Sequence, residues 1–410
     1  MKTKSPSRSI ERLPQNENGL LINGIPVEAV IARAGQTPLY AYDRALIDQR
    51  IAALRQALPQ SISLHYAIKA NPMPAVCAHL VPLVDGFDVA SKGELITVLN
   101  AGANPHSVSF AGPGKTDDEL VAAIASKICV SVESRTELAR CAKLARHLNT
   151  RARICLRVNP NFELKQSGMK MTGLPSQFGI DVNEVEDIVA SQLPDSVQLV
   201  GVQIYSGSQN LNAEALIETA GQTFNLAAEL QGRANTPFKF INVGGGFGIP
   251  YFAHEQSFDL HAVGAALAEH LAAHRTDFKE TEVIIELGRY IVGEAGYYIT
   301  SVVDIKQSRG KKFAIVDGGL HHHLANSGNF GQTLRRNYPV FVANKLNLEM
   351  QEKITIVGPL CTPLDIVASD LTVPELEVGD RIVVLQSGAY GLSASPLRFL
   401  GHPEPVELLV

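Results

Sequence analysis

The sequence predicts an α/β protein made of a parallel (β/α)8 barrel and a second, mainly antiparallel β domain. Two observations predict this fold. Between about residues 60 and 290, eight short apolar strands alternate with helix-like segments, which is the signature of a barrel. After residue 289 the long helical patterns stop, and extended, alternating segments take their place.

The N-terminal part precedes the barrel. Residues 1–18 are polar and lack the apolar core of a signal peptide, so we expect a disordered tail there. Residues 19–44 predict short strands around an Asn-Gly turn, a short helix, and a strand at 37–43. These strands have no helical partner, and we expect them to join the C-terminal sheet. A helix is predicted from 44 to 58, with Asp43 as its N-cap.

The barrel is expected over residues 45–290 and the β domain over residues 291–410. The candidate barrel strands are short apolar segments: 63–69, 86–91, 107–112, 128–134, 152–160, 198–208, 240–248 and 283–289. The segments between them carry apolar side chains at helical spacing: 93–102, 117–126, 136–148, 185–193 and 214–229. The clearest strand-like segments of the β domain alternate without long helices: 295–319, 353–361 and 380–390.

Composition limits the functional class. The chain has 410 residues, 45% of them hydrophobic, without a long uninterrupted apolar segment, which indicates a soluble protein of two domains. The net charge of −5 does not suggest nucleic acid or a membrane as a partner. The five cysteines form neither a disulfide framework nor a zinc pattern, which favours a cytoplasmic location.

In such a barrel, chemistry is expected at the C-terminal ends of the strands. Lys69 ends one strand, because Pro72 cannot continue it, and Asp88 lies on the next strand, just before Ser91 opens a helix. A lysine near a carboxylate is the arrangement that a Schiff-base enzyme needs. A lysine at a strand end can also be an ordinary surface residue, and this stretch alone leaves both interpretations open.

A glycine-rich segment after the penultimate barrel strand indicates a phosphate site. Gly244, Gly245 and Gly246 allow backbone N–H groups to approach a phosphate closely, and late barrel strands often carry such sites. Ser208 could add a hydroxyl to the same site, and Arg289 is a natural phosphate partner. A flexible turn is the alternative explanation of the three glycines.

The last barrel strand carries Glu286, which we expect to direct its carboxylate toward the barrel mouth rather than into a structural salt bridge. Together with Lys69 and the glycine segment, it suggests pyridoxal 5′-phosphate as the cofactor. A carboxylate keeps the pyridine nitrogen protonated, so that the ring accepts electrons from a carbanion at Cα, which favours decarboxylation. An amino-acid racemase of the same fold, which would place an arginine there, remains an alternative, as does a non-catalytic homologue that binds the cofactor.

The chain resembles the fold-type III pyridoxal-phosphate decarboxylases, which include the diaminopimelate, ornithine and arginine decarboxylases. The resemblance extends from about residue 20 to residue 410 and implies an alanine-racemase-like barrel and a homodimer with shared active sites. It is carried by short segments in the family's order: YAIKAN, FDVAS, RVNP, QFGI, GSQ, GGGFG, ELGR, GPLC and GAY.

A narrower resemblance is carried by VDGGLHHHLA, SGNFGQ, GPLCTPLD and QSGAYGLSASP. These segments resemble a subgroup associated with exosortase and exopolysaccharide loci. That subgroup is also similar to decarboxylases that act on carrier-protein-bound glutamyl groups.

The family resemblance implies a role for individual residues. Lys69 would form the internal aldimine, Glu286 would contact the pyridine nitrogen, and Arg157 would lie near the phenolic oxygen of the cofactor. Asp88 would lie close to the Lys69 side of the ring. Cys361, supplied across a dimer interface, would protonate Cα of the quinonoid after carbon dioxide leaves. The phosphate would be held by residues from several segments: Ser208, Gly245, Gly246, Arg289 and Tyr390.

Two positions depart from the family pattern. Tyr205 stands where relatives carry a histidine that stacks on the cofactor ring; an aromatic ring can still stack, but it provides no imidazolium. Thr362 follows Cys361 where diamino-acid decarboxylases have an acidic residue that receives the distal ammonium. A buried ammonium without a carboxylate is costly, so we expect a substrate whose side chain is uncharged, acylated or tethered to a carrier.

The three histidines at 321–323 do not predict a metal site. Adjacent histidines on an extended segment would point to opposite faces, and no second cluster is visible. A contact of His322 or His323 with the substrate, or at an interface, is the expectation we prefer. The loop 163–173 follows a barrel strand, and the sequence does not decide between a lid and plain surface.

Overall fold

The computed structural model describes residues 13–17, 19–162, 169–170, 175–252, 254–328 and 335–410. The chain divides into two compact units. The first, called the barrel below, comprises Arg50–Ile249 and Ser257–Ile291. The second, called the β unit, comprises Met1–Gln49, Pro250–Gln256 and Val292–Val410.

Eight parallel strands close into the barrel, which confirms the predicted fold class. Each strand pairs with the next along the chain, and the last pairs with the first, at Glu286 opposite His65. The strands are β5 (Ile62–Ala67), β6 (Gly86–Val89), β7 (Val108–Phe110), β8 (Cys129–Val132), β9 (Ala152–Asn159), β12 (Val197–Gln203), β14 (Phe240–Gly245) and β15 (Glu282–Leu287). The short strand β11 (Ile180–Asp181) adds to the edge of β9.

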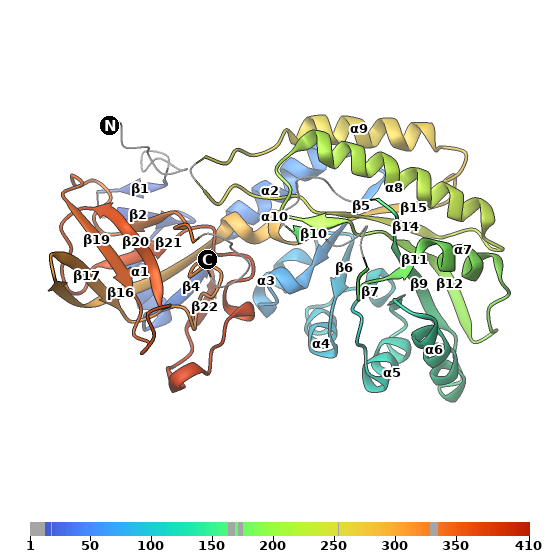
Figure 1. The fold of residues 1–410 in the computed structure, drawn as a ribbon, viewed down its shortest axis with the longest axis horizontal. Coiled ribbons are helices and arrows are strands. Elements are labelled where there is room, and N and C mark those ends of the chain that lie inside the picture. Colours follow the sequence, from blue (N-terminus) through green and yellow to red (C-terminus); the bar gives the residue numbers. More distant parts are fainter. Residues whose placement is uncertain (1–12, 18, 163–168, 171–174, 253, 329–334) are drawn as a thin grey trace. The chain divides into compact units, whose positions relative to one another are not determined.

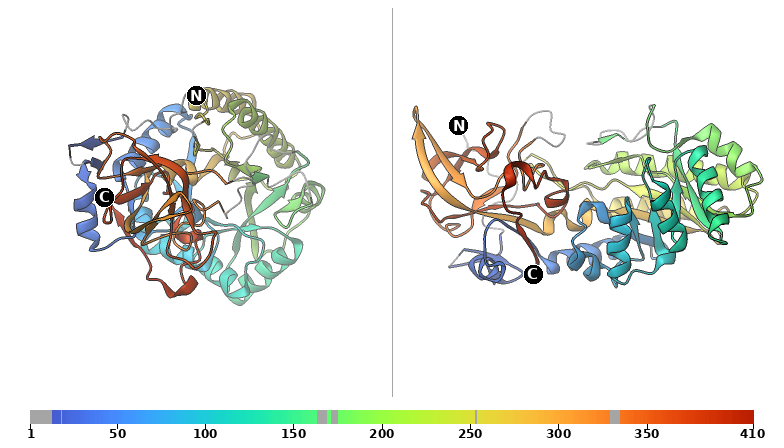
Figure 2. Two further views of the ribbon diagram at one scale, coloured as in Figure 1. Left: turned by 60° about the vertical axis from the view of Figure 1, so that its left-hand side comes forward. Right: turned by 90° about the horizontal axis from the view of Figure 1, so that it is seen from below.

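Helices cover the outside of these strands (Figures 1 and 2). They are α3 (Pro74–Leu80), α4 (Lys92–Asn100), α5 (Asp117–Ala125), α6 (Arg135–His147), α7 (Val182–Ala190), α8 (Ala213–Arg233) and α9 (Leu260–Ala273). Their starts follow local capping chemistry: Ser91 accepts the backbone N–H of Glu94, and Thr116 and Glu119 form a capping box. Among the described residues, no helix is long and apolar enough to cross a membrane.

Two helices extend across the division of the chain. Helix α2 (Arg44–Ala57) begins in the β unit and ends in the barrel, and the short α10 (Arg289–Val292) begins in the barrel. The backbone N–H of Leu46 donates to the Asp43 carboxylate at 3.2 Å, which confirms Asp43 as the cap of α2.

The β unit is built from both ends of the chain, as predicted. The long strand β16 pairs with the N-terminal strand β4 at one edge and with β21 at the other. Most pairs are antiparallel, and β17–β19 and β4–β22 are parallel. The strands are β4 (Leu39–Tyr42), β16 (Gly296–Ser308), β17 (Lys311–Val316), β18 (Val340–Val342), β19 (Glu352–Val357), β20 (Ile366–Val373), β21 (Arg381–Val384) and β22 (Val406–Leu409).

The N-terminal elements add to the core of the β unit. Strands β1 (Gln15–Asn16), β2 (Gly19–Ile22) and β3 (Ile25–Pro26) form a small antiparallel sheet, and α1 (Val27–Ala34) follows it. Leu13, inside the segment that we expected to be a tail, is only 5% exposed and belongs to the same apolar cluster. The rest of the expected tail, apart from residues 14–17, lies outside the described residues.

The boundaries of the units differ in detail from the expected domains. Residues 250–256, which follow β14, cluster with the β unit. There the Tyr251 ring packs on Tyr338 with 4.8 Å between ring centroids, and the Gln386 side chain donates to the carbonyl of Pro250 at 2.6 Å. These contacts join positions far apart in sequence, so no local pattern reveals them.

Helix packing around the barrel gives a test of the fold. Gly264 of α9 lies so close to the end of α2 that an added Cβ would overlap the carbonyl oxygen of Ala57. We expect Gly264→Ala to lower the free energy of unfolding by about 1–3 kcal/mol, measured by chemical denaturation. As a control, Gly232→Ala in α8 meets open space and should stabilise by up to about 1 kcal/mol. Equal effects of the two substitutions would contradict this packing.

Candidate active site

The inward-facing side chains of the barrel change from apolar to polar along the strands. An apolar cluster at one level contains Cys129, Cys155, Phe240 and Ile284. Because side chains two positions apart on a strand share a face, the next inward residues of the same four strands are Ser131, Arg157, Asn242 and Glu286. All four of these are buried. We call this level, toward the C-terminal ends of the strands, the polar layer.

Glu286 lies in the polar layer with 6% of its surface exposed. Its Oε2 accepts a hydrogen bond from the Gln203 side-chain amide at 2.7 Å and a longer one from Asn242 at 3.4 Å. Burial and the nearby charge of Asp88 raise the pKa of this carboxyl, while Lys69, Arg157 and the Gln203 bond act in the opposite direction. The carboxylate therefore depends on its neighbours to stay charged.

Asp88 lies on β6 and is also buried. The hydroxyl of Ser109, on the neighbouring strand β7, donates to one of its oxygens. The other oxygen lies 3.6 Å from Nδ1 of His65, which is 5% exposed. Burial alone would lower the pKa of His65, but the nearby carboxylate of Asp88 outweighs it, so the pKa is raised. The pair thus favours an imidazolium beside a carboxylate.

Arg157 is held by a buried ion pair. Its guanidinium donates to Glu133 at 2.9 Å, and both residues are less than a tenth exposed. Glu133 also accepts the backbone N–H groups of Gly112 at 2.6 Å and Gly179 at 3.0 Å. The Arg157 guanidinium lies over the Phe178 ring, 5.0 Å from its centroid. The backbone N–H groups of these two loops fix the Glu133 carboxylate, and the carboxylate in turn fixes the Arg157 guanidinium.

Lys69 lies just beyond strand β5, in the 3-10 turn η2 (Ile68–Ala70), and its side chain is exposed. Nζ lies 5.3 Å from the centroid of the Tyr205 ring. The turn is tied down on both sides, because the Tyr66 hydroxyl donates to the carbonyl of Asn71 and the Asn71 side chain accepts the N–H of Met73. A primary amine and an aromatic ring therefore face each other at the end of the barrel strands.

The glycine segment bends sharply after β14. Gly244 and Gly246 have φ angles of 69° and 76°, a left-handed conformation that glycine adopts without a Cβ penalty. The loop after β12 is bound to this segment: the backbone N–H of Asn210 donates to Gly246, and the Gln209 amide donates to Ile249 at 2.6 Å. Ser208, in the short strand β13 (Gly207–Ser208), lies in this second loop.

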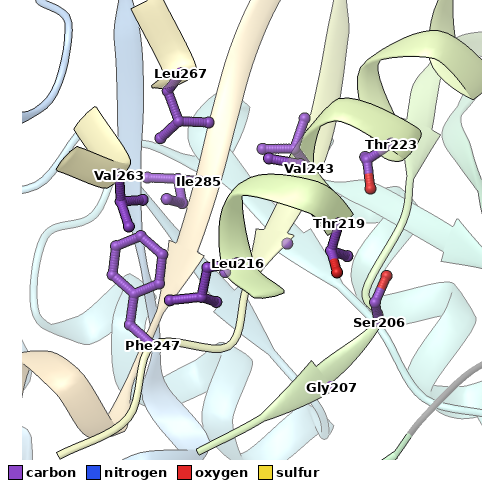
Figure 3. Close-up of a pocket in the computed structure, with 13 residues that line it drawn as sticks. Ser206, Gly207, Leu216, Thr219, Thr223, Val243, Phe247, Val263, Leu267 and Ile285 are labelled. Carbon is purple, nitrogen blue, oxygen red and sulfur yellow. The ribbon is translucent and has the colours of Figure 1, made fainter. Parts of the chain in front are cut away.

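A small cavity of about 30 Å³ lies on the helix side of these loops (Figure 3). Its walls are Ser206 and the glycines of both loops, with Leu216, Thr219 and Thr223 of α8 and Val263 and Leu267 of α9. That volume holds about two water molecules and is far below the 300 Å³ or more of a typical ligand pocket. The cavity therefore lies behind the loops and is not itself a cofactor site.

Cys361 and Thr362 belong to the β unit, on the loop between β19 and β20. The thiol residue is exposed, and Thr362 is half-buried. The loop is shaped by Asp365, whose carboxylate accepts the N–H groups of Leu360 at 2.9 Å and Leu320 at 2.6 Å. Burial raises the pKa of Asp365, while these bonds oppose the rise.

Arg289 is half-buried at the start of α10, in the barrel, and the remaining predicted residues lie in the β unit. Tyr390 is half-buried and has a φ angle of 53°. Residues 321–323 form a helical turn and not the extended segment that we expected, since the N–H groups of His322 and His323 both donate to Gly319. The rings of His321 and His322 lie 3.6 Å apart, between centroids, instead of pointing to opposite faces.

His322 and His323 are buried and hydrogen-bonded inside the β unit. Nε2 of His322 lies 3.0 Å from the carbonyl of Pro403, and Nε2 of His323 lies 3.0 Å from the Ser387 hydroxyl. Nδ1 of His323 accepts the N–H of Asn326 at 3.2 Å. Burial lowers the pKa of His323 to about 3 and that of His322 to about 4.

The barrel brings together five of the predicted residues: Lys69, Asp88, Arg157, Tyr205 and Glu286. Sequence reasoning missed the partners that hold them, namely His65, Ser109, Ser131, Glu133, Gln203 and Asn242. One signal could have found two of these, since Gln203 precedes the predicted Tyr205 by two positions and Asn242 precedes the predicted Gly244 by two. Most of the loop 163–173, considered as a lid, lies outside the described residues.

Residues 44–293 match the model of the family described as pyridoxal-dependent decarboxylase, pyridoxal binding domain. The chain belongs to this family. It is therefore a pyridoxal-phosphate-dependent decarboxylase, as the sequence predicted. The L-glutamyl-[BtrI acyl-carrier protein] decarboxylase of Niallia circulans is 39% identical over 91% of this chain and 89% of that protein.

Two further members of the family cover nearly the whole chain. The 2-[(L-alanin-3-ylcarbamoyl)methyl]-2-hydroxybutanedioate decarboxylase of Staphylococcus aureus is 30% identical over 92% of this chain and 95% of that protein. The crystal structure of diaminopimelate decarboxylase from Helicobacter pylori, complexed with L-lysine, is 31% identical. It covers 93% of this chain and 94% of its own, with a TM-score of 0.82.

The residues of the barrel fit the cofactor of this decarboxylase family. The left-handed glycines provide the close backbone approach that a phosphate needs. In the described part of the chain, Oε2 of Glu286 receives both amide hydrogen bonds and Oε1 receives none of them, which leaves one oxygen for a ring N–H. The Lys69 amine and the Tyr205 ring lie at the same end of the barrel.

The buried histidine of the β unit gives a prediction for pH. His323 has a pKa of about 3 when folded and an ordinary value near 6.5 when unfolded, so the unfolded chain takes up the proton first as pH falls. Stability should therefore decrease from about pH 6.5 down to pH 3, by about 2 kcal/mol at pH 5 for this group. Denaturant unfolding at pH 7 and pH 5 measures the loss.

The comparison needs a variant and a control. In His323→Gln this share of the pH dependence should disappear, whereas the exposed His261→Gln should keep it. An unchanged pH dependence in His323→Gln would show that this ring titrates normally.

Proposed function

We propose that this enzyme removes the α-carboxylate of an amino acid whose side chain is acylated or tethered to a carrier, and not that of a free diamino acid. The observation that carries this proposal is the environment of Thr362. The segment from Gly358 to Asp365 has one acidic residue, Asp365, and its carboxylate is engaged by the backbone of Leu320 and Leu360. A distal ammonium would therefore find no carboxylate there, which disfavours its burial.

Two of the relatives support a substrate of this kind. The Niallia circulans relative acts on a glutamyl group bound to an acyl-carrier protein, and the Staphylococcus aureus relative acts on a carbamoyl-linked derivative of hydroxybutanedioate. Neither named substrate is a free diamino acid. We place the chain in the subgroup associated with exosortase and exopolysaccharide loci, on its C-terminal segments, and propose a cytoplasmic location because the cysteines form no disulfide framework.

We assign the barrel residues as follows. Pyridoxal phosphate, when bound, supplies an electron-accepting ring that stabilises the negative charge left on Cα when carbon dioxide departs. Lys69 holds the cofactor covalently through Nζ, and Tyr205 stacks on its ring. Glu286 holds the proton on the pyridine nitrogen, and Arg157 binds the phenolic oxygen. Asp88 lies on the lysine side of the ring.

The phosphate is assigned to backbone and side-chain groups at the ends of late strands. These are Ser208, Gly244, Gly245, Gly246 and Arg289, with Tyr390 from the β unit. This assignment is supported by the two hydrogen-bonded loops around Gly244 and Gly246. The backbone N–H groups of such loops can bind an anion without help from side chains.

Cys361 is assigned as the acid that gives a proton to Cα, from the partner chain of a homodimer. Its exposure supports this assignment, because a thiol at the surface of one chain is accessible to a second chain. The substrate contact expected of His322 and His323 stays a prediction, and their buried hydrogen bonds favour a packing role.

Replacement of the proposed lysine tests the assignment of the site. In Lys69→Ala we expect the visible absorbance of the bound cofactor and the release of carbon dioxide both to be lost, because no other amine is assigned to hold the cofactor. Lys92→Ala, an exposed lysine on α4, is the matched control and should keep both. Persistence of either signal in Lys69→Ala contradicts the assignment.

The same variant tests whether sites are shared between chains. Mixed Lys69→Ala and Cys361→Ala chains should recover up to about a quarter of wild-type activity if each site takes Lys69 from one chain and Cys361 from the other. Neither variant should recover activity alone. No recovery in mixed dimers, formed by unfolding and refolding together, argues against a shared site.

The substrate is tested by carbon dioxide release from matched compounds. L-glutamyl groups on a carrier protein, or on a pantetheine thioester, should give kcat/KM at least about a hundredfold higher than free L-lysine or diaminopimelate, since several kcal/mol oppose an unpaired ammonium. Thr362→Asp should shift this ratio toward the diamino acids. Equal rates for both classes, or a preference for the diamino acids, would reject the proposed substrate class.

A further inference from the structure

We propose that Ser131 and Gln203 are positioning residues that keep Glu286 as a carboxylate, with one oxygen free to face the cofactor ring. This inference rests on the role proposed above for Glu286. It concerns two residues that no sequence motif singled out, both buried inside the barrel, on β8 and β12.

The geometry is a chain of two short hydrogen bonds. The Ser131 hydroxyl donates to Oε1 of Gln203 at 2.6 Å, and Nε2 of Gln203 donates to Oε2 of Glu286 at 2.7 Å. Ser131 is fully buried, and Gln203 is 3% exposed. These bonds cross the barrel interior, because β9 lies between β8 and β12 in the sheet. The connection therefore does not come from the backbone ladder.

The Glu286 carboxylate selects which end of the amide faces it, and Ser131 pairs the other end. A glutamine side chain can be rotated so that either its oxygen or its nitrogen faces a neighbour. With the oxygen turned toward Glu286, two acceptors would face each other in a dry interior, which is unfavourable. The hydroxyl of Ser131 donates to the amide oxygen on the opposite side, so both ends of the amide are hydrogen-bonded when its N–H faces the carboxylate.

An amide donor stabilises the charged form of Glu286 more than the neutral acid, because a hydrogen bond to an anionic oxygen is stronger than one to a neutral carbonyl. Gln203 and Asn242 both donate to Oε2, so a proton on that oxygen would displace a hydrogen bond. The other charged groups around Glu286 are the carboxylate of Asp88, the cations Lys69 and Arg157, and His65, whose pKa responds to Glu286. Because burial and Asp88 favour the protonated acid, loss of the amide donor would shift the balance toward it.

The experiment follows the protonation of Glu286 in the cofactor-free protein. Infrared difference spectra, recorded from pH 4 to 9, detect the carbonyl band of a protonated carboxyl group. Glu286→Gln identifies the band that belongs to this residue. The variants are Gln203→Met, which removes the donor, and Ser131→Ala, which removes the hydrogen-bond partner of the amide oxygen. Gln198→Met, on the same strand and half-buried, is the control.

We expect the midpoint of the Glu286 band to move upward by about one to two pH units in Gln203→Met, because a hydrogen bond to a charged group is lost. In Ser131→Ala the midpoint should shift in the same direction by a smaller amount. In Ser131→Thr, which keeps the hydroxyl, it should return to the wild-type value, and in Gln198→Met it should not shift. Should Gln203→Met fail to fold, Gln203→Glu has the same shape and should raise the midpoint through two carboxyl groups sharing a proton.

An unchanged midpoint in a folded Gln203 variant overturns the proposal, even if that variant is less active. In the holoenzyme, the acid limb of the kcat profile should shift in the same direction as the band, which a purely structural defect would not produce. The two proposals fail separately. If the band shifts as expected and no substrate releases carbon dioxide, the positioning role stands and the proposed function does not.

Discussion

A carboxylate inside a dry barrel must be compensated, and this constraint organises the centre of the molecule. Moving an ion out of water costs several kcal/mol even after the protein relaxes, so Glu286 is stable as an anion only with donors and cations around it. The amides of Gln203 and Asn242 contact one oxygen directly, and Lys69 and Arg157 act through their charge. Asp88 opposes them and is itself offset by His65.

The barrel meets this constraint by separating its interior into levels. The residues at one level are small or apolar, such as Cys129 and Ile284, and the residues two positions later are polar or charged. The first part of each strand therefore contributes to the apolar core, and its C-terminal end contributes polar side chains to the site. The glycine loop follows the same logic, because β14 passes from Phe240 in the apolar level through Asn242 to Gly244.

Local features of the structure could be predicted from the sequence. The eight strands, the cap at Asp43 and the position of Lys69 after a strand depend on neighbours a few residues away. The cross-barrel partners could not, because Ser131 and Gln203 are 72 residues apart and meet only when the ring closes. The turn at the histidines 321–323 is local but was also not predicted. Its hydrogen bonds to Gly319 are not evident from a run of identical residues.

The two ends of the chain meet in one sheet of the β unit. Strand β4 lies between β16 and β22, and its parallel partner β22 is more than 300 residues later in the sequence. During synthesis the segment Leu39–Tyr42 leaves the ribosome long before Val406–Leu409, so its second edge stays uncovered until that strand is made. The barrel has all its strands long before then, so it can close first, while an unpaired edge on β4 requires protection from other nascent chains.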